Sequence, residues 1–184
     1  MRTAPPPLVP ELLTGAVLAA SAWIAQTEDG TSMARALRTA GLCWLAGFGL
    51  AAVWVDAVHQ RLPDRLVLPA GAGSVLLFCS AAFCNSLPAV AVRTVLAAAT
   101  TAAVFLLLAL FADVGLGDVK LAAPLGAALG YASWSALWLG AVLTFLLAGL
   151  FVALRMLIGH MRRGDQLALG PFLLAGCFAT LCLR

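Results

Sequence analysis

Two aspartates stand at the edges of long apolar runs and could do chemistry as a pair. Asp118 lies in the segment GLGDVKL, which also holds the only lysine of the chain, and Asp56 lies in WVDAVHQRLPDR. An ionisable side chain at or inside a membrane is energetically costly, so it is treated by default as functional. Two carboxyl groups within hydrogen-bond reach share one proton. One can then activate a water molecule while the other polarises a carbonyl, which predicts hydrolysis without a metal ion or a nucleophilic side chain.

The composition places these aspartates in a membrane protein. Of the 184 residues, 63% are hydrophobic and 10% are charged, and the mean hydropathy is +1.03. A chain this apolar is not solvated by water as a monomer. Most of its uncharged stretches approach the roughly 20 residues that an α-helix needs to cross the hydrocarbon core. We therefore expect an all-α fold, a polytopic transmembrane helical bundle.

Charged residues divide the chain into candidate crossings. The uncharged stretch 121–154 is too long for one helix, because at about 1.5 Å per residue it would exceed a bilayer core of about 30 Å. It breaks most naturally at GYAS, residues 130–133. The division predicts six core helices from Thr39 onward. Short links are expected at residues 28–38, 59–65, 85–88, 113–120 and 159–165.

The first segment has two interpretations. Residues 1–27 combine a basic residue, a short apolar region and a run of small residues, which are features of a signal peptide. Glu11 and four prolines make a poor start for a signal peptide, so we favour an extra N-terminal transmembrane helix. The expected organisation is an extra segment and link over residues 1–38, followed by one membrane domain over residues 39–184.

The alternation of crossings puts Asp56 and Asp118 at the same membrane face. The links on this face carry more arginine and lysine than those on the other face. Positive residues gather on the cytoplasmic side of membrane proteins, so we expect the two aspartates to face the cytoplasm.

Residues near Asp118 have assignable roles. Gly115 and Gly117 remove side chains next to the aspartate and permit close approach of a backbone or a substrate. Lys120 is either an interfacial anchor or a support for the GLGDVKL segment, and a helical spacing of two would point it to a different face from Asp118.

Other polar residues have structural interpretations. Asp64 and Asp113 are expected to be helix-capping or solvated carboxylates, and His59 an interfacial histidine. The five cysteines form no C-x-x-C pair, so no metal site is expected. The basic segment HMRRGD, residues 160–165, is read as a topology determinant rather than a nucleic-acid site.

Three segments together resemble a known family. GLGDVKL, the preceding VDAVHQRLPDRLVLP (Val55 to Pro69) and LALGPFLLAG (Leu167 to Gly176) are similar in type and order to segments of the bacterial type IV prepilin peptidases, which are GxGD-type intramembrane aspartyl proteases. The resemblance covers about residues 39–183. A lone G-x-G-D would be weak evidence, and the strength of the match lies in the combination.

The resemblance implies a function and roles for individual residues. It implies that Asp56 and Asp118 are the catalytic aspartates. It also implies a supporting role in the motif for Gly115, Gly117, Lys120 and Pro63. It also implies a multi-pass enzyme of the bacterial cytoplasmic membrane that removes leader peptides from prepilins or pseudopilins with a hydrophobic N-terminal helix, and that needs no cofactor.

The chain departs from the longest members of that family. Those carry an N-terminal insert with paired C-x-x-C motifs and also methylate the new N-terminus, and this insert is missing here. The resemblance is therefore to the short form associated with Flp-type (Tad) pilus systems, and methyltransferase activity is not expected.

Two other classes of function fit the composition. A small proton- or cation-coupled transporter could use Asp56 and Asp118 as relay groups. Transporter sites, however, lie towards the membrane midplane, and these aspartates lie at the ends of the expected helices. A structural membrane scaffold is the third possibility, and it leaves the glycine-flanked Asp118 unexplained.

Overall fold

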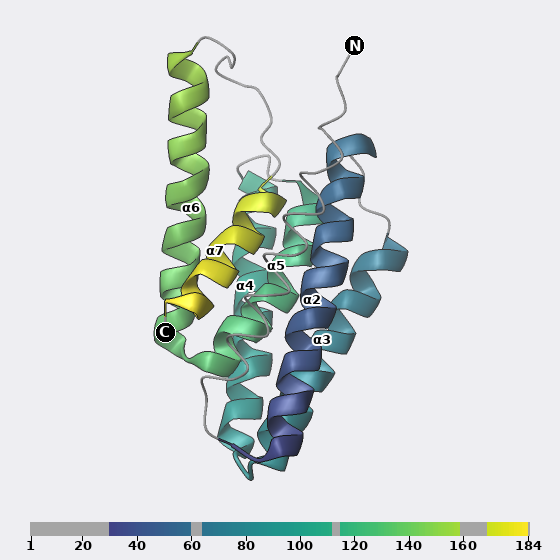
Figure 1. Ribbon diagram of the computed structural model, residues 1–184. Coiled ribbons are helices and arrows are strands. Elements are labelled where there is room, and N and C mark those ends of the chain that lie inside the picture. Colours follow the sequence, from purple (N-terminus) through teal and green to yellow (C-terminus); the bar gives the residue numbers. More distant parts are fainter. Residues whose placement is uncertain (1–29, 60–63, 112–114, 159–168, 184) are drawn as a thin grey trace.

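The computed structural model describes residues 30–59, 64–111, 115–158 and 169–183, and over these residues the chain is helical. The described residues form six helices. Figure 1 shows that successive helices alternate in direction along one bundle axis. Their bounds are α2 Ser32–His59, α3 Asp64–Cys84, α4 Pro88–Phe111, α5 Leu116–Ala132, α6 Trp134–Leu157 and α7 Gly170–Cys182. The predicted helical bundle with six core helices is confirmed. The expected extra N-terminal segment lies outside the described residues.

Two of these helices are long enough and apolar enough to cross a membrane. α4 and α6 have 24 residues each, or about 36 Å, and few of their residues are buried inside the bundle. Large apolar side chains stand exposed on both, among them Leu110 of α4 and Leu146 of α6. Such surfaces are compatible with lipid and not with water, so the bundle is that of a membrane protein.

The long apolar stretch breaks where the sequence predicts. Ser133 has extended backbone angles, φ −175° and ψ 169°, between α5 and α6. Its side chain accepts a hydrogen bond from the backbone N–H of Ala136 at 3.0 Å, which caps the first turn of α6. At the other side of the break, the Arg93 guanidinium donates to the carbonyls of Gly130 and Tyr131 at 2.7 Å each. These bonds satisfy backbone groups that the end of α5 leaves without helical partners.

The helices that follow the links predicted at residues 28–38 and 113–120 begin earlier than expected. α2 begins at Ser32, so Arg35 and Arg38 lie in a helix and not in a link. Arg38 is buried and lies over the Tyr131 ring at 5.6 Å. α5 begins at Leu116, so Asp118 lies in the first helical turn and not in a link over residues 113–120. Charged residues marked the helix ends in the prediction, but a charge does not end a helix when its head group finds a partner there.

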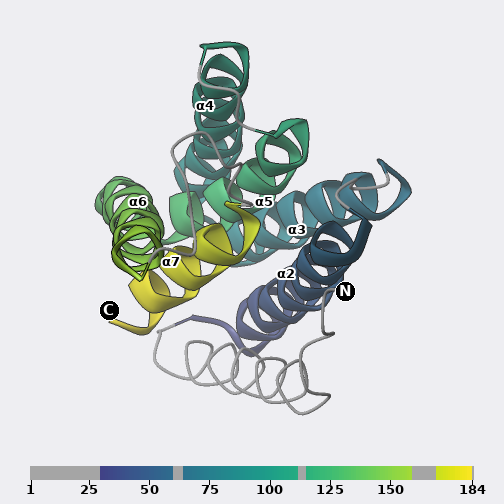
Figure 2. The same cartoon turned by 90° about the horizontal axis from the view of Figure 1, so that it is seen from above.

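α5 is the central helix of the bundle. It contacts α2, α3, α4, α6 and α7, and the view in Figure 2 shows the other helices arranged around it. Its packing against α4 depends on small residues, because a Cβ on Gly126 would collide with the Thr101 side chain and a Cβ on Gly130 would collide with Ala97. The two helices therefore approach closely, and α5 is held firmly on this side.

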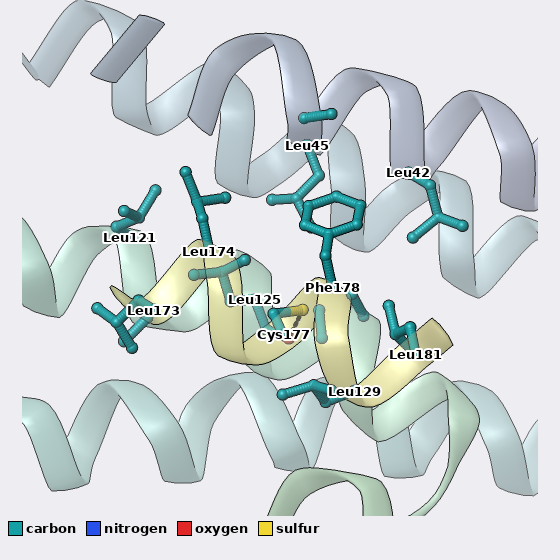
Figure 3. Packing of buried hydrophobic residues seen from close by; sticks show 14 of the residues in the cluster. Leu42, Leu45, Leu121, Leu125, Leu129, Leu173, Leu174, Cys177, Phe178 and Leu181 are labelled. Atoms are coloured by element: carbon teal, nitrogen blue, oxygen red, sulfur yellow. Dashed lines mark hydrogen bonds between the residues drawn. The ribbon is translucent and has the colours of Figure 1, made fainter. Parts of the chain in front are cut away.

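α7 packs against α6, α5 and α2. Figure 3 shows side chains of α7, including Leu174 and Phe178, pointing into the buried cluster with Leu45 of α2 and Leu125 of α5. Leu174 lies so close to the backbone of Gly49 that an added Cβ would come within 2.7 Å of its Cδ2. This close packing ties α7 to α2 as well as to α5.

Candidate active site

The helix directions bring the turns that hold Asp56 and Asp118 to the same end of the bundle. Asp56 lies one turn before the end of α2, and Asp118 is the third residue of α5. α7 contacts both helices, and it touches α2 at Gly49. Asp56 lies two helical turns after Gly49 on α2. The backbone arrangement thus agrees with a pair. The side chain of Asp56 lies outside the described residues, so the pairing itself remains a prediction.

Asp118 is a buried carboxylate at a helix start. Its side chain is 6% exposed. Its backbone N–H donates to the carbonyl of Gly115 at 3.0 Å, and its Oδ2 accepts a hydrogen bond from the backbone N–H of Leu169 at 3.4 Å. Leu169 is the residue before α7, so the first turns of two helices meet at this carboxylate. Helix N-termini carry partial positive charge and free N–H groups, which stabilise a negative side chain.

The amide of Leu169 was not among the predicted site residues. A signal for it exists in the sequence, because the segment LGPF places a proline in the first turn of a helix, where its missing N–H costs nothing. A helix start at Gly170 leaves the amide of the preceding residue available to an acceptor. What the sequence does not contain is the information that the acceptor is Asp118, fifty-one residues earlier in the chain.

The two glycines of the motif lie at the start of α5, on either side of Leu116. Gly115 is exposed and precedes α5 with φ −61° and ψ 134°, angles that any residue can adopt. A Cβ at this position would lie 3.8 Å from Asp118 Oδ2, an ordinary contact. Gly117 is partly exposed in the first turn. Neither the backbone nor the neighbouring side chains require glycine at 115, so the expectation that Gly115 and Gly117 admit a substrate stays a prediction.

Lys120 and Asp118 lie on different sides of α5. Lys120 is exposed and Asp118 is buried, as a spacing of two on a helix dictates. Its role as an interfacial anchor or as a support for the motif stays a prediction. Pro63 and Asp113 lie outside the described residues, as do the side chains of His59 and Asp64.

The described residues contain no group of three or more His, Cys, Asp and Glu side chains that could hold a metal ion. All five cysteines are described, and none of them forms a disulfide. Cys177 is buried against α5, with its Sγ 3.9 Å from the carbonyl of Leu125. Among the described residues, the Asp118 carboxylate accepts from the backbone amide of Leu169 at the start of α7. Such a site suits acid-base chemistry at a carbonyl if a second carboxyl group joins it.

Comparison with known proteins gives one match. The sequence matches the family model described as the type IV leader peptidase family over residues 43–157. This range is more than half of the chain and contains the positions of both predicted catalytic aspartates. No curated protein and no solved structure matches the chain. Because the family model matches more than half of the chain, the chain belongs to the type IV leader peptidase family.

Proposed function

We propose that this protein is an intramembrane aspartyl endopeptidase that removes leader peptides from prepilins or pseudopilins of Flp (Tad) type at the cytoplasmic face of the bacterial inner membrane. Membership of the leader peptidase family supports peptidase chemistry in general. The single observation that carries the aspartyl assignment is the buried Asp118 carboxylate at the bundle end where α2 also presents the turn of Asp56.

The chemistry follows from two carboxyl groups that share one proton. The ionised carboxylate takes a proton from a water molecule, whose oxygen adds to the scissile carbonyl carbon, while the protonated carboxyl donates its proton to the carbonyl oxygen. The resulting tetrahedral diol collapses when one hydroxyl returns its proton, the carbon–nitrogen bond breaks and the leaving nitrogen is protonated. The leader leaves with a new carboxylate, and the pilin keeps a new amino terminus.

The bundle also supports the class of substrate. The described helices are joined by short connections and carry no soluble domain between them, so recognition must rely on an extended leader and on an apolar helix beside the bundle. A helical peptide hides its carbonyls in hydrogen bonds, and a glycine before the cut favours the unwound backbone that hydrolysis needs. The orientation with this site towards the cytoplasm is supported by the greater number of basic residues on that side.

A processing assay tests the proposal. The enzyme and a prepilin from the same genome are co-expressed, and leader removal is followed by the shift in pilin mass. Asp56→Asn and Asp118→Asn should each abolish processing while the protein stays in the membrane, because an amide cannot exchange the shared proton.

Asp64→Asn and Asp113→Asn are the matched controls and should retain most of the processing. Substantial leader removal by either of the first two variants would overturn the aspartyl assignment. Loss of processing in all four variants would indicate a general effect of removing acidic residues, and would also count against it.

A further inference from the structure

A groove opens between α4 and α6, with α5 and α7 as its floor. α4 and α6 stand apart in Figure 2, and the rings of Phe105 and Phe145 bridge them at one level, stacked with centroids 6.1 Å apart. The groove encloses a cavity of about 30 Å³. Its lining consists of Thr101, Phe105, Ala122, Leu125, Gly126, Leu129, Leu137, Gly140, Ala141, Thr144, Leu173 and Cys177.

The groove offers nothing to a polar ligand. Its two hydroxyl groups are already bonded within their own helices: Thr101 donates to the carbonyl of Ala97 at 2.7 Å and Thr144 donates to that of Gly140 at 2.8 Å. The remaining lining side chains are aliphatic, aromatic or a thiol. Gly126 of α5 and Gly140 of α6 leave space in the lining because they have no side chain. An occupant must therefore be apolar.

The groove is continuous with the candidate active site along two helices. On α5, the lining residues share one helical face with Asp118, at spacings of four, seven, eight and eleven residues. On α7, Leu173 and Cys177 follow Leu169, whose amide bonds Asp118, at spacings of four and eight. The groove thus begins one turn from the carboxylate and runs away from it towards the opposite end of the bundle.

From this continuity we propose that the groove receives the apolar helix of the substrate that follows the scissile bond. The inference rests on the proposed function. The cavity is too small for a helix, so the substrate helix lies across the mouth of the groove and inserts one apolar side chain. At about 1.5 Å per residue, the lining of α5 extends from about 6 to about 16 Å beyond Asp118. The inserted side chain therefore belongs to a residue about 4 to 11 positions after the cut.

Cysteine cross-linking tests this register. The background is an enzyme in which the native cysteines are replaced by alanine and Asp118 is replaced by asparagine to prevent cleavage. In this background, Ala141→Cys places a thiol in the groove. Leu146→Cys, on an exposed part of the same helix, is the matched control. Single cysteines are placed along the substrate helix, and disulfides are formed with a mild oxidant in membranes. We expect cross-links from position 141 to substrate residues about 4 to 11 after the cut, at helical spacing, and none from position 146.

Cleavage kinetics provide a second readout. Ala141→Trp fills the groove and should lower kcat/KM for the prepilin about tenfold, the equivalent of losing the burial of one apolar side chain, whereas Leu146→Trp should not. Three outcomes would each overturn the proposal. These are equal cross-linking from positions 141 and 146, cross-links to substrate residues outside the expected window, and no cross-links at all because a lipid chain occupies the groove. Failure of the unmodified enzyme to process any prepilin would instead refute the proposed function.

Discussion

The bond between the Leu169 amide and Asp118 can be removed without removing anything else from the backbone. Leu169 precedes α7 with φ −78°, an angle that proline adopts. Its carbonyl, which accepts from the N–H of Leu173 at 2.9 Å, is retained in Leu169→Pro. Its own N–H, which donates to Asp118 Oδ2, is lost. Leu169→Ala keeps the N–H and also loses the leucine side chain, so the difference between these two variants isolates the amide.

The size of the effect follows from the geometry of the bond. A hydrogen bond to a charged group contributes about 1.5 to 3 kcal/mol, and strong charge-assisted bonds are shorter than the 3.4 Å observed here. We therefore take about 1 kcal/mol, which corresponds to about a fivefold change in rate. The amide holds one carboxylate oxygen and so fixes the direction in which the other points. Its loss should lower kcat and leave KM unchanged, because the substrate does not bind to it.

The assay is steady-state cleavage of a purified prepilin by the enzyme in detergent, with thermal unfolding of each variant measured in parallel. Leu169→Pro should have about one fifth of the kcat of Leu169→Ala, with the same KM and a similar unfolding temperature. Equal kcat values for the two variants would refute a positioning role for the amide. A rise in KM without a fall in kcat would show that this part of α7 binds substrate instead.

Three further predictions concern packing and topology. Gly126→Ala should lower the free energy of unfolding by about 1 to 3 kcal/mol, because the added Cβ collides with α4. Gly149→Ala, whose Cβ meets no neighbour, should raise the free energy of unfolding by up to about 1 kcal/mol. Thermal unfolding in detergent measures both effects. Arg93→Ala should lower the same quantity by about 2 kcal/mol because carbonyls at the end of α5 lose their donor, and an unchanged unfolding temperature would contradict this role. In a cysteine-free background, a cysteine at Ser86 should react with an impermeant reagent from outside the inner membrane, and a cysteine at Leu157 should react with it from the cytoplasm. Labelling of both cysteines from one side would refute the alternating topology.

The sequence was sufficient for the parts of the fold that depend on hydropathy and local breakers. The number of core helices and the break at Ser133 follow from the length that a bilayer allows and from the residues 130–133. The placement of Asp118 at one end of the bundle follows from the alternation of crossings. These features need no knowledge of which helix touches which.

The parts that depend on tertiary contacts could not be predicted. Arg93 lies inside α4, and the sequence does not show that its guanidinium donates to carbonyls at the end of α5. Arg38 lies inside α2 because it packs over the Tyr131 ring. The amide of Leu169 joins the candidate site only because α7 docks against α5 and α6. Each case requires the position of a residue far away in the sequence, which periodicity does not provide.

The unequal lengths of α6 and α7 have a consequence for the surrounding lipid. α7 has 13 residues, or about 20 Å, and stands beside the 36 Å of α6 (Figure 1). Phe172 near the start of α7 packs against Phe151 with ring centroids 5.2 Å apart, and α6 continues for six more residues to Leu157, about 9 Å further. Asp118, which is bonded at the start of α7, therefore lies below the end of α6. A helix this short does not span a hydrocarbon core of about 30 Å, and local thinning of the bilayer is one way in which such a mismatch is accommodated. Thinning brings water, the second substrate of hydrolysis, down to the carboxylate. Leader cleavage by the reconstituted protein should accordingly slow as the acyl chains of the host bilayer are lengthened.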